Sequence, residues 1–518
     1  MQLIDFFDRA AKRYPERAAF VQPDGDVFTY ADAEGVSRKL AAAIQSLDVS
    51  EAAKIAVYSP NDARAFFAML GVFRAGLIWV PLNARNSVED NIAFVETADV
   101  EFIFYHSSFE DKVKEIRQAV PHLKGFACLD KGGELGPSLE ALISANHGEL
   151  EELPADPDRP CAILATGGTT GRSKGAVWTN QVWETLIANF WTSIPPAENP
   201  VHLCVAPMTH AAGVLSLMLM PRGPSNIILS QADPVGILEA IERHRVTHLY
   251  LPPTLLYMLL ASPELQRYDT RSLQFLLISA APVSSEKLKE AHAAFGPVVC
   301  QAFGQAEAPF FLTFLSREDH QRAVENPDQV HLLRSCGRPT MFSQVEIMND
   351  EGQLLGPGEV GEIVARGNLV FPGYYNNPEA TAAVSACGWH HTGDLGYKDE
   401  NDYVFIVDRK KDMIITGGFN VYSTEVEEVL LAHQAVQDCA VIGVPDEKWG
   451  EAIKAIVELK PGSTVEPEDI IAHCRKRLGG VKTPKSLDVW DSLPRSPVGK
   501  VLKRRIRDRF WDKSDRQV

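Results

Sequence analysis

The chain of 518 residues is 45% hydrophobic and 23% charged, a globular composition that excludes a disordered or collagen-like protein. Its formal net charge of −17 opposes the basic surface that a nucleic-acid-binding protein needs, so no nucleic-acid partner is expected. At roughly 100 to 200 residues per domain, this length predicts three or four folding units with substantial hydrophobic cores.

The first residues do not read as a secretory signal, because charged side chains interrupt the apolar positions from Asp5 onward. The longest apolar stretches, residues 211–220 and 249–260, are too short for a membrane span. Eight widely spaced cysteines form no CxxC motif, and we expect buried thiols in a reducing compartment. We therefore predict a cytoplasmic protein without a transmembrane segment; a homodimer stays open.

From the N-terminus to about residue 150, helical and strand patterns alternate. Residues 3–11 and 63–74 have helical patterns, whereas residues 53–58, 78–81 and 102–105 are apolar runs typical of buried strands. Residues 201–330 repeat this alternation, with strands expected at 202–206, 226–229, 248–251 and 275–278. The pattern predicts two similar α/β halves with largely parallel sheets.

The pattern changes after residue 335. Short strands separated by glycines predict a small antiparallel β unit over residues 335–408. Residues 409–518 contain 20 basic and 17 acidic side chains, so this segment is far less acidic than the rest of the chain. We predict an N-terminal domain over 1–408 and a separate C-terminal domain over 409–518.

The most informative segment is residues 165–175, ATGGTTGRSKG, which lies between apolar runs at 161–164 and 176–178. Glycines let backbone N–H groups converge on a bulky anion, threonine hydroxyls add donors, and Lys174 adds positive charge. These properties suit a polyphosphate. The segment is not a Walker motif, because Gly171 is followed by Arg172 and Ser173, and by itself it could equally be a flexible hairpin.

Three further segments carry chemistry that suits a nucleotide. Residues 389–394, WHHTGD, place a carboxylate on a tight turn, which suits two hydrogen bonds to ribose hydroxyls. Residues 303–307, FGQAE, set an aromatic face beside a carboxylate suited to Mg²⁺. Residues 494–500, PRSPVGK, present Lys500 on a loop punctuated by glycine and proline. Any one of these alone is compatible with ordinary turn chemistry.

In this order, the four segments closely resemble the adenylate-forming superfamily of acyl-CoA synthetases, nonribosomal adenylation domains and beetle luciferases. The resemblance covers essentially the whole chain and implies an α/β fold. In that fold, a large N-terminal domain of two similar α/β subdomains plus a small β unit precedes a small, mobile α+β C-terminal domain. It extends to further segments: 207–213 (PMTHAAG), 279–282 (SAAP), 361–363 (GEI), 373–374 (GY), 409–414 (RKKDMI), 417–420 (GGFN), 425–427 (EVE) and 444–446 (VPD).

The resemblance implies a two-step reaction. A carboxylate attacks the α-phosphorus of MgATP, which releases pyrophosphate and leaves an acyl adenylate, and the thiol of CoA then displaces AMP. Lys500 would stabilise the charge that develops in the first step. Glu307 and Thr169 would face Mg²⁺, and His210 would be the gate between the ATP site and the acyl pocket. The catalytic set is thus Lys500, Glu307 and His210.

The resemblance also implies how the nucleotide and CoA are bound. After the first step the C-terminal domain would rotate about a hinge at Lys411 and bring a glycine wall to the pantetheine tunnel. The implied nucleotide-binding residues are Thr166, Gly167, Gly168, Thr169, Thr170, Gly171, Lys174, Ala280, Ala281, Gln301, Ala302, Phe303, Gly304, Asp394 and Arg409. The implied residues for hinge motion and CoA are Lys411, Gly417, Gly418 and Trp449.

Two positions depart from the family pattern. Gly167 stands where the family usually has Ser, and Ala306 where it usually has Thr, so two hydroxyl groups are missing. A lost hydrogen bond to a charged group is worth roughly 1.5–3 kcal/mol. We nevertheless favour an active enzyme over a catalytically degenerate nucleotide-binding homologue, because four functional residues remain: Lys500, Glu307, Asp394 and Arg409.

The expected acyl pocket combines small residues with flanking aromatic ones and has no fixed cation, which suits an apolar monocarboxylate. Aryl or cinnamate-like, cyclic and medium-chain acids all fit, and an aryl or medium-size acid is favoured over a long-chain one. An enzyme that loads a carboxylic or amino acid onto a carrier protein is the alternative. The expected pocket residues are His210, Ala211, Gly213, Thr254, Ser279, Phe303, Gly304, Ala308, Pro309 and Phe310.

Overall fold

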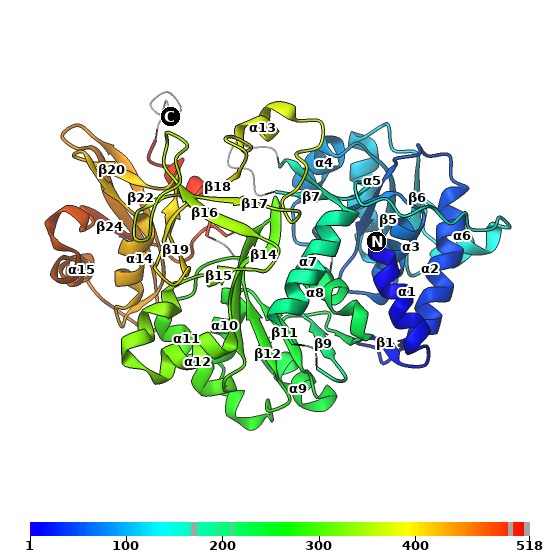
Figure 1. Cartoon of the computed structure of the whole chain (residues 1–518), viewed down its shortest axis with the longest axis horizontal. Coiled ribbons are helices and arrows are strands. Elements are labelled where there is room, and N and C mark those ends of the chain that lie inside the picture. The colour runs from blue at the N-terminus through cyan, green and yellow to red at the C-terminus, as the bar shows by residue number, and fades with distance from the viewer. Residues whose placement is uncertain (167–172, 196, 209–210, 496–500, 512–518) are drawn as a thin grey trace.

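The computed structural model describes residues 1–166, 173–195, 197–208, 211–495 and 501–511. A nine-stranded sheet runs through its middle (Figure 1). Six neighbouring strands, from β13 to β1, are parallel, and the remaining strands are antiparallel to their neighbours. The strand order is β15 (Arg338–Pro339), β14 (Ala308–Leu315), β13 (Val299–Gln305), β12 (Phe275–Ile278), β11 (His248–Leu251), β9 (Val201–Cys204), β10 (Ser225–Ile228), β1 (Ala18–Val21) and β2 (Val27–Thr29).

A six-stranded sheet forms the other α/β half, and only β8 in it is antiparallel to its neighbour. The strands expected in both halves are confirmed to within two residues at each end. One detail differs, because β1 pairs with β10 and so carries N-terminal residues into the sheet of the second half. The strand order is β6 (Gly125–Cys128), β5 (Val100–Tyr105), β3 (Lys54–Tyr58), β4 (Ile78–Leu82), β7 (Pro160–Ala165) and β8 (Gly175–Thr179).

Helices flank these sheets, and many begin at a side-chain cap. Asp62, for example, accepts a hydrogen bond from the backbone N–H of Arg64 and so satisfies one unpaired donor of the first turn. The helices of the N-terminal part are α1 (Leu3–Arg13), α2 (Tyr30–Gln45), α3 (Ala63–Arg74), α4 (Val88–Thr97), α5 (Glu110–Ala119), α6 (Leu139–Ala145), α7 (Asn180–Ser193), α8 (Ala211–Leu219), α9 (Pro234–His244), α10 (Pro253–Leu260), α11 (Ser285–Phe295), α12 (Arg317–Glu325) and α13 (Pro378–Ala383). Short 3₁₀ turns are η1 (Ser107–Phe109), η2 (Met220–Arg222), η3 (Leu265–Arg267) and η4 (Pro327–Arg334).

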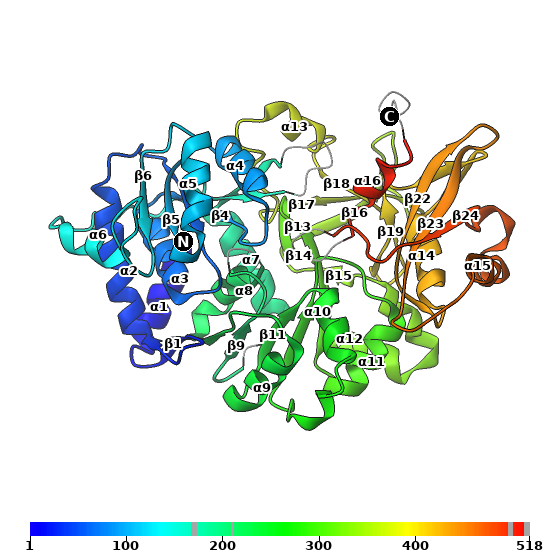
Figure 2. The ribbon, with the colours of Figure 1, turned by 180° about the vertical axis from the view of Figure 1, so that it is seen from behind.

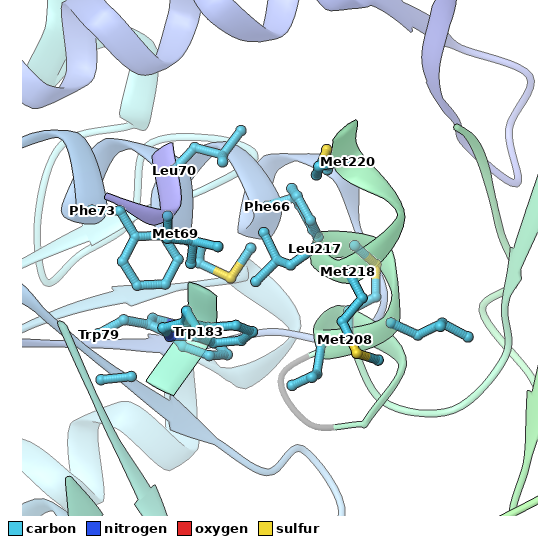
Figure 3. Packing of buried hydrophobic residues seen from close by; sticks show 14 of the residues in the cluster. Phe66, Met69, Leu70, Phe73, Trp79, Trp183, Met208, Leu217, Met218 and Met220 are labelled. Carbon is cyan, nitrogen blue, oxygen red and sulfur yellow. The ribbon is translucent and has the colours of Figure 1, made fainter. Parts of the chain in front are cut away.

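One continuous core joins the two halves, and α3 lies at its centre. Every residue of α3 except Arg64 is buried, as expected for a helix that is apolar on most of its sides. Figure 3 shows Phe66, Met69 and Phe73 of this helix packed near Trp183 of α7 and Met218 of α8. Burial of such large side chains contributes roughly 1.5–3 kcal/mol each. The shared core holds the edges of the two sheets in a fixed relation.

A small antiparallel sheet follows, which confirms the expected change of pattern. Its strands are β16 (Gln344–Met348), β17 (Gly361–Arg366), β18 (His390–Lys398) and β19 (Val404–Arg409). The C-terminal unit lies beyond it at one end of the molecule (Figures 1 and 2) and has its own buried core. Its elements are β20 (Ile414–Thr416), β21 (Phe419–Val421), α14 (Ser423–Leu431), β22 (Val436–Asp446), β23 (Gly450–Leu459), α15 (Pro467–Lys482), β24 (Ser486–Val489) and α16 (Lys503–Arg507).

Two other expectations can be compared with the structure. Within the described ranges, no helix combines the length and the apolar character that crossing a bilayer requires.

All eight cysteines are free thiols, and six of them are buried, but Cys387 is exposed and Cys336 is only partly buried. The expectation of buried thiols is therefore wrong for Cys387, which lies in a turn with a positive φ of 54° and not in a core element.

Candidate active site

The expected nucleotide residues gather where the parallel strands of the larger sheet end. β12 ends at Ile278 and is followed by Ser279, Ala280 and Ala281, while Gln301 and Ala302 lie on the neighbouring strand β13. Ala280 has φ of 79°, an uncommon value for a residue with a side chain. Because carboxyl ends of parallel strands share one edge, and ligands of open α/β sheets bind there, we take this edge as the candidate site.

Glu307 stands at the tip of the β13–β14 hairpin. Gln305 pairs with Ala308, so Ala306 and Glu307 form the turn. Two bonds from outside the hairpin fix this turn: the indole Nε1 of Trp178 donates to the carbonyl of Ala306 at 2.7 Å, and the backbone N–H of Phe371 donates to the carbonyl of Glu307 at 2.8 Å. The Glu307 residue is 9% exposed, so the carboxylate is held in a nearly buried position.

The hairpin needs glycine next to its turn. A Cβ added at Gly304 would lie 2.5 Å from the backbone nitrogen of Phe310, which itself has φ of 54°. The backbone here departs from a regular ladder, since the pairing register shifts between Phe303 and Gln305. Gly304 is thus required by the shape of the hairpin.

The glycine-rich segment joins β7 to β8. The backbone N–H of Thr166 donates to the carbonyl of Lys174 at 2.9 Å, which closes the base of the connection. The Lys174 ammonium lies 4.4 Å from the ring centroid of Tyr374. Five residues predicted to bind phosphate lie outside the described residues: Gly167, Gly168, Thr169, Thr170 and Gly171.

Tyr374 is a residue that the sequence reasoning did not place in the site. Its hydroxyl donates to Oε1 of Glu307 at 2.6 Å, so its side chain contacts both Lys174 and Glu307. Burial and the neighbouring Glu307 carboxylate raise the pKa of this phenol far above its usual value. Its sequence signal was the Gly373–Tyr374 pair, which supported the resemblance but carried no assigned role.

The expected ribose residues form an ion pair on adjacent strands. Asp394 of β18 and Arg409 of β19 are register partners, and Nε of Arg409 lies 2.6 Å from Oδ1 of Asp394. Asp394 is 3% exposed, and its backbone N–H donates to the hydroxyl of Thr392 at 3.1 Å. Gly393, between them, has φ of 72°, which explains the glycine in this turn.

A further contact ties the ribose strand to the Glu307 hairpin. Gln305 and His390 are joined through their side-chain Nε2 atoms at 2.8 Å, and His390 also contacts the ring of Phe371. Burial lowers the pKa of His390 to about 4, so its imidazole is neutral at physiological pH. The predicted phosphate, metal and ribose residues that the structure describes are therefore brought to one region by direct contacts.

The expected acyl-pocket residues divide into three groups. Ser279, Ala308 and Pro309 are buried next to the edge, and Phe310 makes an edge-to-face contact with Tyr250 of β11 at 6.0 Å, so Tyr250 is a neighbour that the sequence reasoning missed. Thr254 lies half-buried in the first turn of α10. His210 and the side chain of Ala211 lie outside the described residues.

Gly213 has a role other than lining an open wall. An added Cβ at this position would lie 1.8 Å from the carbonyl oxygen of Met208. The glycine therefore lets α8 approach the chain segment that leads into it. A side chain at this position would point at the Met208 backbone and not into an open space. The placement of Gly213 in the pocket wall therefore stays a prediction.

The residues expected for the second half-reaction lie in the C-terminal unit. Gly417 and Gly418, with φ of 57° and 82°, form the turn of the β20–β21 hairpin. The backbone N–H of Gly417 donates to the carbonyl of Trp449 at 2.8 Å, and Trp449 is 42% exposed. In Figure 1 this unit lies on the far side of β16–β18 from β7, so the structure does not bring these three residues to the nucleotide edge.

The expected hinge is surrounded by charged groups that the sequence did not reveal. Lys411 is exposed and follows Arg409, the last residue of β19. Lys503 of α16 is partly buried, with 16% of its side chain exposed. Its ammonium lies 2.7 Å from Oε1 of Glu427 and donates to the hydroxyl of Ser423 at 2.6 Å. Ser423 in turn donates to Asp408 at 2.9 Å. Lys500, three residues before Lys503, lies outside the described residues.

The donor set at Glu307 fits Mg²⁺ bound together with a nucleotide. Among the described residues, no donor bonds the second oxygen of Glu307, Oε2, and no three His, Cys, Asp or Glu side chains form a closed metal site. Mg²⁺ prefers one or two carboxylates combined with phosphate oxygens and water. One fixed carboxylate is therefore a suitable protein contribution; Thr169, the second predicted ligand, lies outside the described residues.

Comparisons with known proteins agree with this geometry. The family model described as AMP-binding enzyme matches residues 7–375, and the model described as AMP-binding enzyme C-terminal domain matches residues 425–500. The chain is 40% identical over 407 residues to the medium/long-chain-fatty-acid–CoA ligase FadD8 of Mycobacterium tuberculosis, covering 74% of this chain and 69% of that protein. It is 34% identical over 506 residues to a feruloyl-CoA synthase of an Amycolatopsis species, covering 97% and 98%.

Solved structures show the same fold. The amide bond synthetase McbA from Marinactinospora thermotolerans has a TM-score of 0.89 and 28% identity to this chain, and the match covers 99% of this chain and 100% of that chain. The fold class expected from the sequence, with a large N-terminal α/β part and a small C-terminal domain, is thereby confirmed.

Proposed function

The chain belongs to the family of AMP-binding enzymes, and from this premise we propose that it is an AMP-forming ligase that joins an apolar carboxylic acid to CoA. The observation that carries the proposal is the set of contacts at the sheet edge. Lys174 and Glu307 meet through Tyr374, and the Asp394–Arg409 pair is linked to the same hairpin through His390 and Gln305.

The described residues divide the binding of ATP among them. Lys174 supplies positive charge to the phosphates, and Asp394 supplies carboxylate oxygens to the ribose hydroxyls. Glu307 is the carboxylate that would hold Mg²⁺, which when bound neutralises phosphate charge. Ala280, with φ of 79°, and Ala281 would lie beside the adenine. Binding and orientation of this kind account for most catalysis in phosphoryl transfer.

Lys500 is proposed as the catalytic residue of the first step. Its ammonium would stabilise the negative charge that grows as the substrate carboxylate attacks the α-phosphorus. His210 and Thr169 keep their proposed roles as pocket gate and second metal ligand. For the second step, we propose that rotation about Lys411 brings Gly417 and Gly418 to the acyl adenylate and that Trp449 stacks on CoA.

The substrate class follows from the chemistry of the wall and from the names of the relatives. FadD8 is named for medium- and long-chain fatty acids, and the Amycolatopsis protein for ferulate. Buried Ala308 and Pro309, together with Phe310, provide apolar surface, and the neighbouring buried Ser279 adds a neutral hydroxyl and no charge. We propose an aryl or medium-size apolar monocarboxylate, because a second carboxylate would have no buried partner there.

The test is pyrophosphate release from MgATP with a panel of aromatic, cyclic and straight-chain acids, each measured with and without CoA. We expect CoA-dependent turnover with one class of acid, and loss of at least about 100-fold in Lys500→Ala, the scale of a removed transition-state contact. Lys513→Ala is the control, since it removes a lysine to which we assign no role.

The outcomes separate the remaining alternatives. Pyrophosphate release without a CoA product would indicate another acceptor, and an amine should then be tried first, because the McbA structure is that of an amide bond synthetase. If no acid gave pyrophosphate release, a catalytically degenerate homologue would be favoured. Restoring the missing hydroxyl with Ala306→Thr would test that explanation directly. Preference for a dicarboxylate or an amino acid would overturn the apolar pocket.

A further inference from the structure

Tyr374 joins two groups of opposite charge that do not pair with each other. Its hydroxyl donates to Oε1 of Glu307 at 2.6 Å, and the Lys174 ammonium lies 4.4 Å from its ring centroid. Within the described part of the chain, Lys174 has no carboxylate within 4.0 Å, the limit for an ion pair. A lysine and a nearly buried glutamate that share one aromatic neighbour would normally be expected to attract one another.

The position of Tyr374 is itself fixed on three sides. Tyr374 forms an antiparallel β-bridge with Ala176 of β8, and Ala176 directly follows the glycine-rich segment 165–175. The backbone N–H of Tyr374 donates to the hydroxyl of Thr381 at 2.9 Å, and its ring packs edge-to-face on Phe371 with a centroid distance of 4.9 Å. Tyr374 is 8% exposed, so its side chain has little room to change direction.

We propose that Tyr374 is a positioning residue that keeps Lys174 and Glu307 apart, so that the ammonium is reserved for phosphate oxygens and the carboxylate for Mg²⁺. A direct Lys174–Glu307 ion pair would neutralise both groups before the ligand arrives. The ring offers Lys174 a cation–π contact in place of the carboxylate, and the hydroxyl orients Glu307 through a charge-assisted hydrogen bond. The inference rests on the proposed function, because it takes the roles of Lys174 and Glu307 from it.

Tyr374→Phe tests the hydroxyl while leaving the ring that Phe371 and Lys174 contact. We expect the half-saturating Mg²⁺ concentration for MgATP binding to rise about tenfold, the factor of one lost hydrogen bond to a charged group. At saturating Mg²⁺, ATP affinity should stay within about twofold of that of the unsubstituted protein, because phenylalanine keeps the ring that Lys174 contacts. Binding is measured by calorimetry at stepped Mg²⁺ concentrations without acid substrate, so the readout does not depend on turnover.

Tyr375→Phe is the matched control. The Tyr375 hydroxyl, one residue further on, donates to Asp99 at 3.1 Å instead of to the site. This variant loses the same atom from the same segment, so we expect an unchanged Mg²⁺ requirement. If both phenylalanine variants raised the Mg²⁺ requirement equally, a general loosening of the segment would explain the effect and the inference would be overturned.

Combination with Glu307→Gln separates positioning from a merely structural role. If Tyr374 acts through Glu307, Tyr374→Phe should have no further effect on Mg²⁺ dependence in the Glu307→Gln background. An undiminished additional effect there would overturn the inference. The same series separates it from the proposed function. If the unsubstituted protein binds no MgATP, or Glu307→Gln leaves the Mg²⁺ requirement unchanged, the assignment of the site fails; if Glu307→Gln raises it and Tyr374→Phe does not, only the role of Tyr374 fails.

Discussion

The charged groups around Tyr374 and those at the hinge are arranged in opposite ways. At the edge, Lys174 and Glu307 both contact Tyr374 and form no direct pair, and Lys174 is partly exposed. At the hinge, Lys503 lies 2.7 Å from Glu427, and both residues are largely withdrawn from solvent. The difference agrees with the proposal that Lys174 and Glu307 are reserved for a ligand, whereas Lys503 and Glu427 neutralise each other where chain segments join; Asp394 and Arg409, the proposed ribose residues, do form a direct pair.

The same substitution in the two regions should break or support this comparison. Lys503→Met removes one partner of a partly buried pair and leaves the Glu427 carboxylate without its ammonium, so we expect a loss of about 1.5–3 kcal/mol in unfolding free energy, the scale of a lost hydrogen bond to a charged group. Lys174→Met should lower stability by less than about 1 kcal/mol, since no ion pair is lost, while weakening ATP binding. Denaturant unfolding followed by circular dichroism measures both. Equal losses in the two variants would contradict the comparison.

His390 should make stability at the edge depend on pH. Its folded pKa of about 4 lies below the ordinary 6.5, so the folded state binds fewer protons than the unfolded state. The contribution of neutral His390 to the unfolding free energy is fully present above pH 6.5 and is lost as the pH falls toward 4. The total loss is roughly 3 kcal/mol. His390→Gln retains an amide that can bond Gln305, and should flatten this part of the profile. Unfolding free energies at pH 5 and pH 7 provide the measurement.

Glu427 at the hinge gives the contrasting sign and serves as the control. Burial raises its folded pKa to about 6 from 4.5, in spite of the opposing attraction of Lys503. Its contribution is therefore fully present below pH 4.5 and is lost as the pH rises through 6. A Glu427→Gln profile that changed in the same direction as that of His390→Gln would show that the two regions do not differ in this way.

Lys411→Pro sharpens the comparison by stiffening the backbone at the expected hinge, between the N-terminal part of the chain and the C-terminal unit. The described structure gives the Lys411 backbone N–H no hydrogen bond, so proline removes none of those present while it fixes φ. We expect pyrophosphate release to stay within about threefold and thioester formation to fall at least about tenfold, because only the second step needs rotation. Separate assays of the two half-reactions check this. Equal loss in both would remove the support for domain rotation.

The smallest expected effects distinguish two neighbouring glycines of the C-terminal hairpin. An added Cβ at Gly417 would lie 2.6 Å from the Trp449 ring, whereas at Gly418 it would meet nothing within 4 Å. Both positions have a positive φ, which disfavours alanine by about 1–2 kcal/mol. Gly417→Ala should therefore lower the melting temperature more than Gly418→Ala, and the thermal unfolding of both variants measures the difference. A larger effect at Gly418 would indicate that Trp449 does not limit the hairpin.

Much of the fold could be predicted because its strands are locally encoded. The apolar runs that became β3, β11 and β12 are flanked by turn residues and are buried on both faces, so their pattern needs no tertiary information. The pairing of β1 with β10 could not be predicted, because the partner strand lies about 200 residues away and register is set by the assembled sheet.

The candidate site shows the same division. Lys174, Glu307 and Asp394 lie in glycine-containing segments, and the composition of these segments predicts that they bind a nucleotide. Tyr250 carries no such local signal, and the segments GY and FGQAE, which contain Tyr374 and Gln305, do not reveal what these two side chains contact. Their contacts arise from segments that meet only after the hairpin, β8 and β18 have packed together.

By itself the sequence determined the α/β class, the family resemblance and the order of the segments that are proposed to bind phosphate, metal and ribose, because these depend on short-range patterns and on residue chemistry. Only the tertiary structure decided that Tyr374 contacts both Lys174 and Glu307, and that Lys503 forms an ion pair with Glu427. The physical reason is that charge and hydrogen-bond partners are chosen by distance and burial, and neither quantity exists for a residue until distant parts of the chain are packed around it.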